Sequence, residues 1–204
     1  MRARNARPYM VRRRINILRV ISGEARGHKL KTLKGSATRP TSDRVKESLF
    51  NIVSGYIQGS EVLDLFAGSG SLGIEALSRG AAYAVFADKS KESCGIIKEN
   101  LAFTKFAEKS EVLFMGFTEA LVKLASEGKK FDIVFLDPPY NKNFIQETLK
   151  NLAKNDIIRD GGILIAEHHI DDELPEYSGK LKISRKQKYG DTVISFYRGD
   201  TPLH

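Results

Sequence analysis

From Glu61 onward, short apolar runs alternate with amphipathic stretches, and this alternation is the feature that most limits the possible folds. Strands followed by helices in strict order indicate a parallel sheet covered by helices on both faces. The sequence therefore predicts an open α/β fold. We expect strands at 61–66, 82–88, 111–115, 131–136 and 162–167, and helices at 70–79, 90–103, 117–126 and 143–153.

The last part of the chain departs from this alternation. Two further strands are expected near 181–188 and 191–198, and the Tyr189-Gly190 turn between them is too short for a crossover helix. These strands should form an antiparallel hairpin. Five parallel strands closed by such a hairpin resemble the seven-stranded, Rossmann-like sheet of the class I methyltransferases.

The N-terminal part predicts a smaller unit. Short strands are expected at 15–22 and 28–33, and the stretch around Arg39-Pro40 then interrupts the chain before a helix that Thr41 or Ser42 can cap. We divide the chain into three parts on this basis. They are a basic tail at 1–14, a β-hairpin extension at 15–37 and a methyltransferase-like domain at 38–204.

Positive charge is concentrated in the first 46 residues. They hold 14 Lys and Arg against Glu24 and Asp43, a local net charge of +12, whereas the whole chain carries +8, which leaves −4 for the remaining 158 residues. A basic arm on a mildly acidic body suggests contact with a polyanion. The alternatives are a solubilising tail and a short organellar transit peptide.

Composition excludes several other classes of protein. The single cysteine, Cys94, cannot form an internal disulfide or a cysteine metal cage, and no apolar run approaches the ~20 residues that span a bilayer. Glu167-His168-His169 contains metal-ligand residue types, but adjacent residues on a strand point to opposite faces. We expect a cytoplasmic, monomeric protein with neither a metal site nor a membrane contact.

A glycine-rich turn follows the first strand of the alternating region, in the stretch V-L-D-L-F-A-G-S-G-S-L-G. Ligands of open α/β sheets bind at this end of the strands. Gly68, Gly70 and Gly73 match the dinucleotide pattern G-x-G-x-x-G. Asp64, however, places a carboxylate before the turn, which disfavours a pyrophosphate and suits an ammonium group. The turn resembles the loop of class I methyltransferases that binds the ammonium-bearing S-adenosylmethionine.

The next two strands should carry further ligand contacts. Asp88 ends the second strand and can accept both ribose hydroxyls, a role that an NAD protein would share. Gly116-Phe117 stands where many methyltransferases have an acidic residue, and Phe117 either covers the adenine or fills the core. The predicted cofactor-binding residues are Asp64, Phe66, Ala67, Gly68, Gly70, Asp88, Lys89, Gly116 and Phe117.

The motif D-P-P-Y directly follows the apolar run at 131–136. Prolines fix φ and carry no N–H, so the carbonyl of Pro138 should face outward beside the carboxylate of Asp137. Tyr140 can lie against a planar ring. Two acceptors and a stacking face suit the exocyclic amine of a base. We predict that Asp137, Pro138, Pro139 and Tyr140 form the catalytic site.

Three motifs together resemble the RsmD family, the bacterial small-subunit (16S) ribosomal RNA guanine-N2 methyltransferases. They are R-P-T-x-D-R-V-K-E-x-L-F-N from Arg39 to Asn51, D-x-F-A-G-S-G-x-L-G followed by E-A-L-S-R, and D-P-P-Y. The likeness runs from about Leu18 to Arg198. It implies methyl transfer from S-adenosylmethionine to the exocyclic N2 of one loop guanine in assembled or nearly assembled small subunits, with S-adenosylhomocysteine as product.

Basic residues near the N-terminus are the candidates for contact with ribosomal RNA. They would bind phosphates and hold the RNA in register without reading its sequence. Arg39 and Arg44 could instead line the cofactor cleft. The predicted RNA contacts are Arg26, Lys29, Lys31, Arg39 and Arg44, with Lys34 and Lys46 as further candidates.

Four other functions share part of this pattern. A DNA adenine-N6 methyltransferase shares D-P-P-Y, but such enzymes usually carry a target-reading domain for which this chain has no room. An NAD-dependent oxidoreductase would need a substrate domain. A non-catalytic RNA-binding module would not need the cofactor loop, and methyltransferases of protein substrates typically have Asn at the position of Asp137.

Overall fold

The computed structural model describes residues 18–33, 43–138 and 144–199, and it contains one mixed sheet of eight strands in these ranges. The strand order is β3-β2-β1-β4-β5-β8-β7-β6. The strands are β1 (Glu61–Asp64), β2 (Tyr83–Asp88), β3 (Ser110–Phe114), β4 (Phe131–Leu136), β5 (Ile158–His169), β6 (Tyr177–Ser178), β7 (Leu181–Tyr189) and β8 (Thr192–Gly199).

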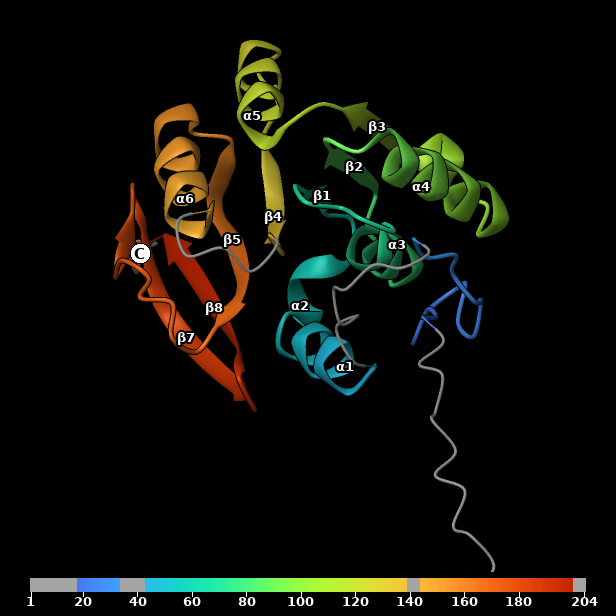
Figure 1. The fold of residues 1–204 in the computed structure, drawn as a ribbon, viewed down its shortest axis with the longest axis horizontal. Helices are drawn as coiled ribbons and strands as arrows, with labels where there is room; N and C mark the ends of the chain where they lie inside the picture. Colours follow the sequence, from blue (N-terminus) through green and yellow to red (C-terminus); the bar gives the residue numbers. More distant parts are fainter. Residues whose placement is uncertain (1–17, 34–42, 139–143, 200–204) are drawn as a thin grey trace, which may run out of the picture.

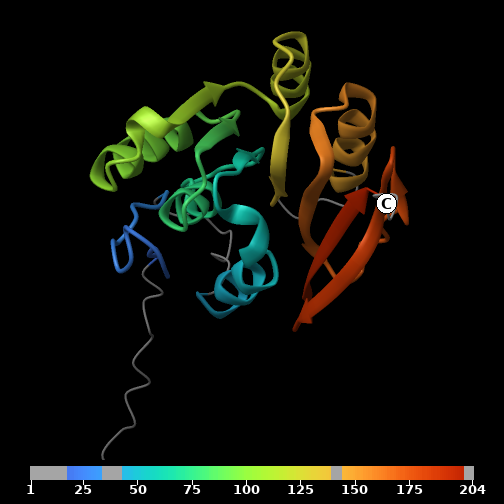
Figure 2. The same ribbon diagram turned by 180° about the vertical axis from the view of Figure 1, so that it is seen from behind.

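The first five strands are parallel, and β8 pairs antiparallel with both β5 and β7. The predicted parallel sheet closed by an antiparallel hairpin is therefore confirmed, and Figures 1 and 2 show this hairpin at one side of the molecule. The sheet has one strand more than predicted. The extra strand, β6, has two residues and pairs with the first two residues of β7, Leu181 and Lys182.

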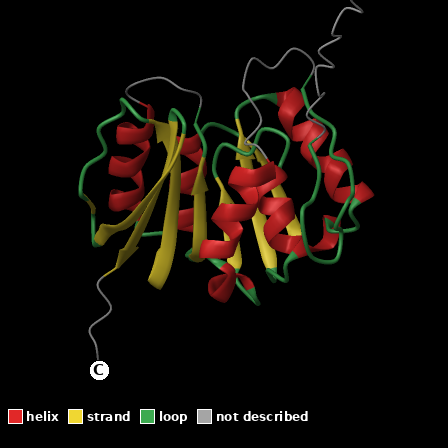
Figure 3. Cartoon of the chain, turned by 90° about the horizontal axis from the view of Figure 1, so that it is seen from below, coloured by secondary structure: helices red, strands yellow, loops and turns green. Residues whose placement is uncertain are grey.

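Helices cover both faces of the sheet, as Figure 3 shows. The helices are α1 (Asp43–Ile52), α2 (Ser54–Ile57), α3 (Ser71–Ser78), α4 (Lys91–Phe103), the 3-10 turn η1 (Ala107–Lys109), α5 (Phe117–Ser126) and α6 (Phe144–Asn155). Buried side chains of α1 to α4 pack on one face, and those of α5 and α6 pack on the other. The order of helices and strands agrees with the sequence, although β5 begins four residues earlier than predicted.

The N-terminal extension packs directly on α3 and α4, where both ribbon views place it. Leu18, Val20, Ala25 and Leu30 belong to the same buried cluster as the helices of that face. The two predicted strands of the extension are not formed as strands in residues 18–33. The structure has one isolated bridge, between Arg19 and Lys29, because Gly23 and Gly27 turn the chain within a few residues.

A buried carboxylate anchors this extension. Glu75 of α3 is fully buried and accepts hydrogen bonds from the backbone N–H groups of Ile21 and Ser22 at 2.7 and 3.0 Å. It also forms ion pairs with Lys46 at 3.2 Å and Arg79 at 2.8 Å. A buried charge is tolerated when it is paired and hydrogen-bonded, and here the partners come from three separate segments.

Lys46 was a candidate for phosphate contact, and the structure shows that this prediction is wrong. Its side chain is fully buried and its Nζ also donates to the carbonyl of Arg19 at 2.6 Å. Burial lowers the pKa of this lysine, while the charge of Glu75 acts in the opposite direction. Lys46 thus stabilises the junction of α1, α3 and the extension.

Candidate functional site

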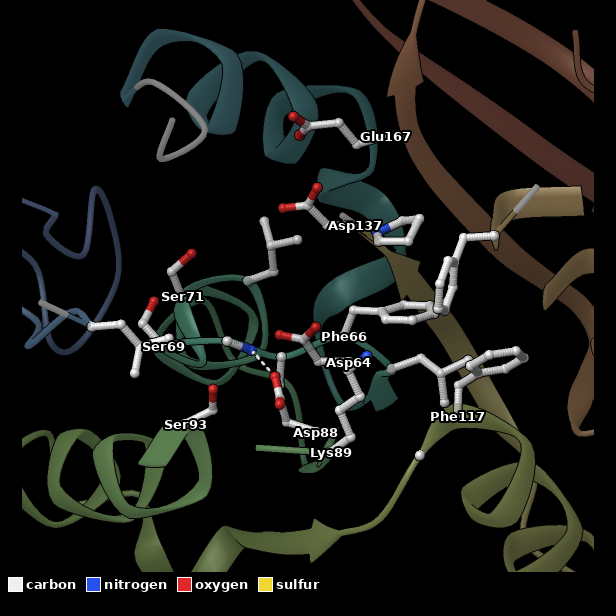
Figure 4. A pocket seen from close by; sticks show the side chains of 18 of the residues that line it. Asp64, Phe66, Ser69, Ser71, Asp88, Lys89, Ser93, Phe117, Asp137 and Glu167 are labelled. Atoms are coloured by element: carbon white, nitrogen blue, oxygen red, sulfur yellow. Dashed lines mark hydrogen bonds between the residues drawn. The ribbon is translucent and has the colours of Figure 1, made fainter. Parts of the chain in front are cut away.

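A cavity of about 510 Å³ opens at the carboxyl ends of the central strands. Its walls come from the loops after β1, β2, β3 and β4, from β5 and from the N-terminal extension. Leu18, Thr32 and Leu33 supply the contribution of the extension. The predicted cofactor loop and the predicted catalytic loop therefore face one shared space, which Figure 4 shows from close by.

Four carboxylates lie on one face of the sheet along this cavity. Asp64 is in register with Phe86 of β2 and Phe135 of β4, and Phe135 is in register with Ile165 of β5. Residues two positions apart on a strand share a face. Asp88 and Glu167 follow Phe86 and Ile165 by two positions, and Asp137 follows Phe135 in the same way. Four neighbouring strands thus each direct one acid to the same side: Asp88, Asp64, Asp137 and Glu167.

Asp64 is the most enclosed of these acids, with 1% of its surface exposed. One of its oxygens accepts the backbone N–H of Gly73 at 3.1 Å. Burial raises its pKa from 3.8 to about 7, and the nearby Asp88 adds to the rise, whereas the Gly73 hydrogen bond opposes it. A cationic ligand that approaches such a carboxyl group stabilises its ionised form, so binding of the ligand is favourable.

Asp88 is held in a fixed orientation by two backbone groups. One oxygen accepts the N–H of Gly68 at 2.9 Å, the dashed line in Figure 4, and the other accepts the N–H of Ser90 at 2.8 Å. Each carboxylate oxygen can accept more than one hydrogen bond. Each oxygen of Asp88 can therefore accept a further hydrogen bond beside the backbone N–H that it already binds.

The glycine-rich turn has separate reasons for its glycines. Gly68 and Gly70 have φ values of 54° and 79°, a region in which side chains with a Cβ are strained. A Cβ on Gly73 would lie 2.3 Å from the ring of Phe86. Gly73 therefore allows α3 to pack closely on β2. Asn100 of α4 also stabilises the loop, because its Nδ2 donates to the carbonyl of Ser69 at 2.9 Å.

The far wall of the cavity is aromatic. The rings of Phe66 and Phe117 are 5.5 Å apart, and Phe144 of α6 lies 6.1 and 5.8 Å from them. The ammonium of Lys89 lies 5.7 Å from the centre of the Phe144 ring. All four residues line the cavity, with Ala67 and Gly116 beside them. Phe117 both lines the cavity and packs against the rings of Phe66 and Phe144.

The predicted catalytic loop is described as far as Pro138. Asp137 and Pro138 line the cavity, whereas Pro139 and Tyr140 lie outside the described residues. Burial raises the pKa of Asp137 well above its usual range, and the charges of Glu167 and Asp64 raise it further. Asp137 is therefore a strong proton acceptor whenever it is ionised.

The predicted RNA contacts have different environments. Arg26, Lys29, Lys31 and Arg44 are all exposed, and Arg39 lies outside the described residues, as does Lys34. Lys31 forms an exposed ion pair with Glu99 at 2.6 Å. Three of these cations, Arg26, Lys29 and Lys31, lie on the extension, of which three other residues line the cavity.

The sequence did not indicate a site role for Glu167, Phe144 or Asn100. Glu167 was considered only as a metal ligand, and Phe144 and Asn100 were not considered at all. The position of Glu167 near the carboxyl end of a strand was the available signal, since the other acids occupy equivalent positions. No group of three potential metal ligands occurs within residues 18–33, 43–138 and 144–199, and no helix in these ranges has the length and apolar character to cross a membrane.

Comparison with known proteins places this architecture among rRNA methyltransferases. Residues 18–198 match the family described as Conserved hypothetical protein 95. Ribosomal RNA small subunit methyltransferase D of Haemophilus influenzae is 40% identical over 77% of this chain and 81% of its own length. The protein of the same name from Escherichia coli is 34% identical over 89% of both chains.

A solved structure gives the same picture of the fold. A conserved hypothetical protein from Streptococcus pyogenes superimposes with a TM-score of 0.71 at 35% identity and covers 78% of this chain and 98% of its own. The family match over residues 18–198 includes the extension, the strands of the sheet and the residues that line the cavity.

Proposed function

This chain belongs to the family described as Conserved hypothetical protein 95, the RsmD family, and we propose that it methylates the exocyclic N2 of a guanine in small-subunit (16S) ribosomal RNA. Its relatives show that it is a methyltransferase of ribosomal RNA that uses S-adenosylmethionine. Its proposed substrate is an assembled or nearly assembled small subunit, and its proposed location is the cytoplasm.

The observation that carries this proposal is the shared cavity. The glycine-rich turn after β1 and the Asp137-Pro138 pair after β4 line the same space of about 510 Å³. A methyl donor and a base amine must meet within bonding distance, so both loops have to serve one site. Adjacent strands β1 and β4 provide this arrangement directly.

The cofactor end of the cavity fits S-adenosylmethionine by charge. Asp64 and Asp88 line this end, and their carboxyl groups favour a ligand with an ammonium and a sulfonium over the pyrophosphate of NAD. Asp88 would accept the ribose hydroxyls, and Phe117 would cover the adenine. The raised pKa of Asp64 is the expected state of a carboxyl group in a site that receives a cation.

Asp137 and Pro138 would hold the reacting amine. An aromatic amine is a poor nucleophile because its lone pair is delocalised, and hydrogen bonds from its two N–H groups to the Asp137 carboxylate and the Pro138 carbonyl favour a pyramidal nitrogen. Bound S-adenosylmethionine supplies a methyl group on a cationic sulfur, which keeps the S–C electron pair as the nitrogen lone pair forms the N–C bond. Asp137 or a water then takes the proton that the nitrogen loses.

RNA would reach this site across the extension. Arg26 and Lys29 are exposed on the extension, of which Leu18, Thr32 and Leu33 line the cavity, and they would contact phosphates of the bound RNA. A base must leave its neighbours to enter a cavity of this kind, which a loop nucleotide does at lower cost than a paired one. Tyr140 is proposed to stack on this base.

Label transfer from methyl-tritiated S-adenosylmethionine tests the proposal. Unmodified small subunits, free ribosomal RNA and duplex DNA are assayed in parallel, and the labelled nucleoside is then identified. We expect N2-methylguanosine in small subunits. N6-methyladenine in DNA would contradict the proposed substrate but agree with the proposed cofactor. Absence of label from all three would contradict the proposed activity.

A further inference from the structure

We propose that Glu167 is the residue that selects guanine, by accepting the N1–H of the base whose N2 amine is held by Asp137. This inference rests on the proposed function, because it describes how the same site distinguishes one amine-bearing base from another. It assigns a substrate-binding role to a residue outside the D-P-P-Y motif and on a different strand.

Register places Glu167 beside Asp137. Leu136 of β4 is the partner of Ala166 of β5, and each of the two acids is the next residue of its chain. Both residues line the cavity. Figure 4 shows the two carboxylates on neighbouring elements and directed to the same side of the cavity. A planar ligand that reaches one of them is therefore within reach of the other.

The two carboxyl groups suit a ligand with two donors. Glu167 has 7% of its surface exposed, and its charge is one of the causes that raise the pKa of Asp137. Carboxylates that face one space repel each other, and a ligand that donates to both of them reduces this repulsion. Guanine supplies such donors, because its N1–H and N2–H groups are adjacent on one edge of the base.

The same pair disfavours other bases with an exocyclic amine. Adenine and cytosine present an unprotonated ring nitrogen beside the amine, and this lone pair would face the Glu167 carboxylate. A site built to accept a hydrogen bond rejects a ligand that lacks the donor more strongly than an apolar pocket rejects a change of size. Asp137 and Pro138 bind only the amine, which all three bases have. Glu167 thus provides the contact that distinguishes guanine from adenine and cytosine.

The test changes the hydrogen-bond donor at N1 of the base and, separately, the acceptor at position 167 of the protein. Small subunits are reconstituted with guanine or 2,6-diaminopurine at the target position, which is mapped beforehand with the wild-type enzyme. Diaminopurine keeps the 2-amino group but has an acceptor at N1. We expect the wild type to methylate the diaminopurine subunit roughly tenfold to a hundredfold less efficiently than the guanine subunit, measured as kcat/KM.

Glu167→Gln should reduce this preference at least about tenfold, because its amide can donate to N1 of diaminopurine as well as accept from guanine. Glu167→Ala should reduce the preference similarly, with a lower rate on both substrates. Thermal unfolding and binding of S-adenosylmethionine establish that each variant is folded. Glu119→Gln is the matched control, since it removes a carboxylate that lines the cavity from α5 rather than from β5, and it should change both rates by the same factor.

Two outcomes separate the inference from the proposed function. An unchanged preference in folded Glu167→Gln and Glu167→Ala, with the wild type still forming N2-methylguanosine, overturns the role of Glu167 and leaves the proposed function intact. A wild type that forms no N2-methylguanosine overturns both.

Discussion

The two ends of the cavity use carboxylates in different ways. At the cofactor end, both oxygens of Asp88 and one oxygen of Asp64 accept backbone N–H groups of the glycine-rich turn and the loop after β2. At the transfer end, Asp137 and Glu167 lie beside each other, and the charge of one raises the pKa of the other. The carboxylates of the cofactor end are therefore oriented by the backbone of their own loops, whereas the two acids of the transfer end are coupled to each other by charge.

This difference shows how one cavity can bind two ligands of different chemistry, the cofactor and the substrate base. The cofactor is the same in every reaction cycle, so a fixed set of backbone hydrogen bonds can orient its receptors. The substrate base arrives as part of a large RNA, and the receptor must distinguish it from other bases. Four predictions separate the two ends.

The largest effect should come from the transfer end. Asp137→Ala removes an acceptor of the reacting amine, and loss of one oriented group at a reaction centre typically lowers kcat by about 100- to 1000-fold. Affinity for S-adenosylmethionine, measured by calorimetry, should stay within about threefold because Asp137 lies beyond the cofactor receptors. A comparable loss of cofactor affinity would show that the two ends are not separate.

The second largest effect should come from Asp64. Asp64→Asn keeps an oxygen that can accept the N–H of Gly73 but removes the charge that faces the cofactor ammonium. A hydrogen bond to a charged group contributes about 1.5–3 kcal/mol, so affinity should fall roughly tenfold to a hundredfold. The rate at saturating cofactor should change much less. A loss confined to kcat would place Asp64 at the transfer end and contradict the comparison.

The pH dependence of cofactor binding should report the same carboxyl group. The pKa of Asp64 is raised to about 7, and the ammonium binds its ionised form, so affinity should rise with pH through this value, by at most about tenfold per pH unit. Without ligand the direction for stability is opposite. The unfolded carboxyl ionises near 3.8, so this group lowers the free energy of unfolding as the pH rises from there to about 7.

Calorimetry between about pH 5.5 and 7.5 measures this effect below the range in which an α-amino group titrates. In Asp64→Asn the dependence should become flat. A variant that retains the full slope would show that another group, not Asp64, controls binding.

The smallest effect should come from the support of the cofactor loop. Asn100 donates to Ser69 and to the carbonyl of Lys31, and it accepts the N–H of Lys31, so it joins the loop to the extension. Asn100→Ala should weaken cofactor binding by about threefold to tenfold, because a hydrogen bond contributes about 1 kcal/mol. Glu99→Gln removes only the exposed ion pair with Lys31 and is the matched control. Equal effects in the two variants would exclude a specific role for Asn100.

Much of the fold could be predicted because its determinants are local. The alternation of apolar runs and amphipathic stretches indicated the order of helices and strands, and the short Tyr189-Gly190 turn indicated the hairpin. The short strand β6 was missed, since two residues carry no periodic pattern. Two paired strands were predicted in the extension, but the structure has only the bridge between Arg19 and Lys29 within residues 18–33. The apolar residues of this segment pack on α3 and α4 and do not extend a sheet.

The candidate site divides in the same way. Gly68, Gly70 and Asp64 could be identified because a turn and its neighbouring acid lie within a few residues of sequence. Lys46 could not be judged in this way, since its partner Glu75 and the carbonyl of Arg19 are 29 and 27 positions away. A lysine in a basic segment looks exposed until another element covers it.

The sequence by itself determined the alternating architecture, the glycine-rich turn and the D-P-P-Y motif, because periodicity, turn conformation and proline chemistry act over short stretches of chain. Only the tertiary structure decided that Glu167 joins Asp137, that Asn100 holds the cofactor loop and that the extension forms a wall of the cavity. These contacts depend on strand register and helix packing, which bring residues together across long separations in sequence.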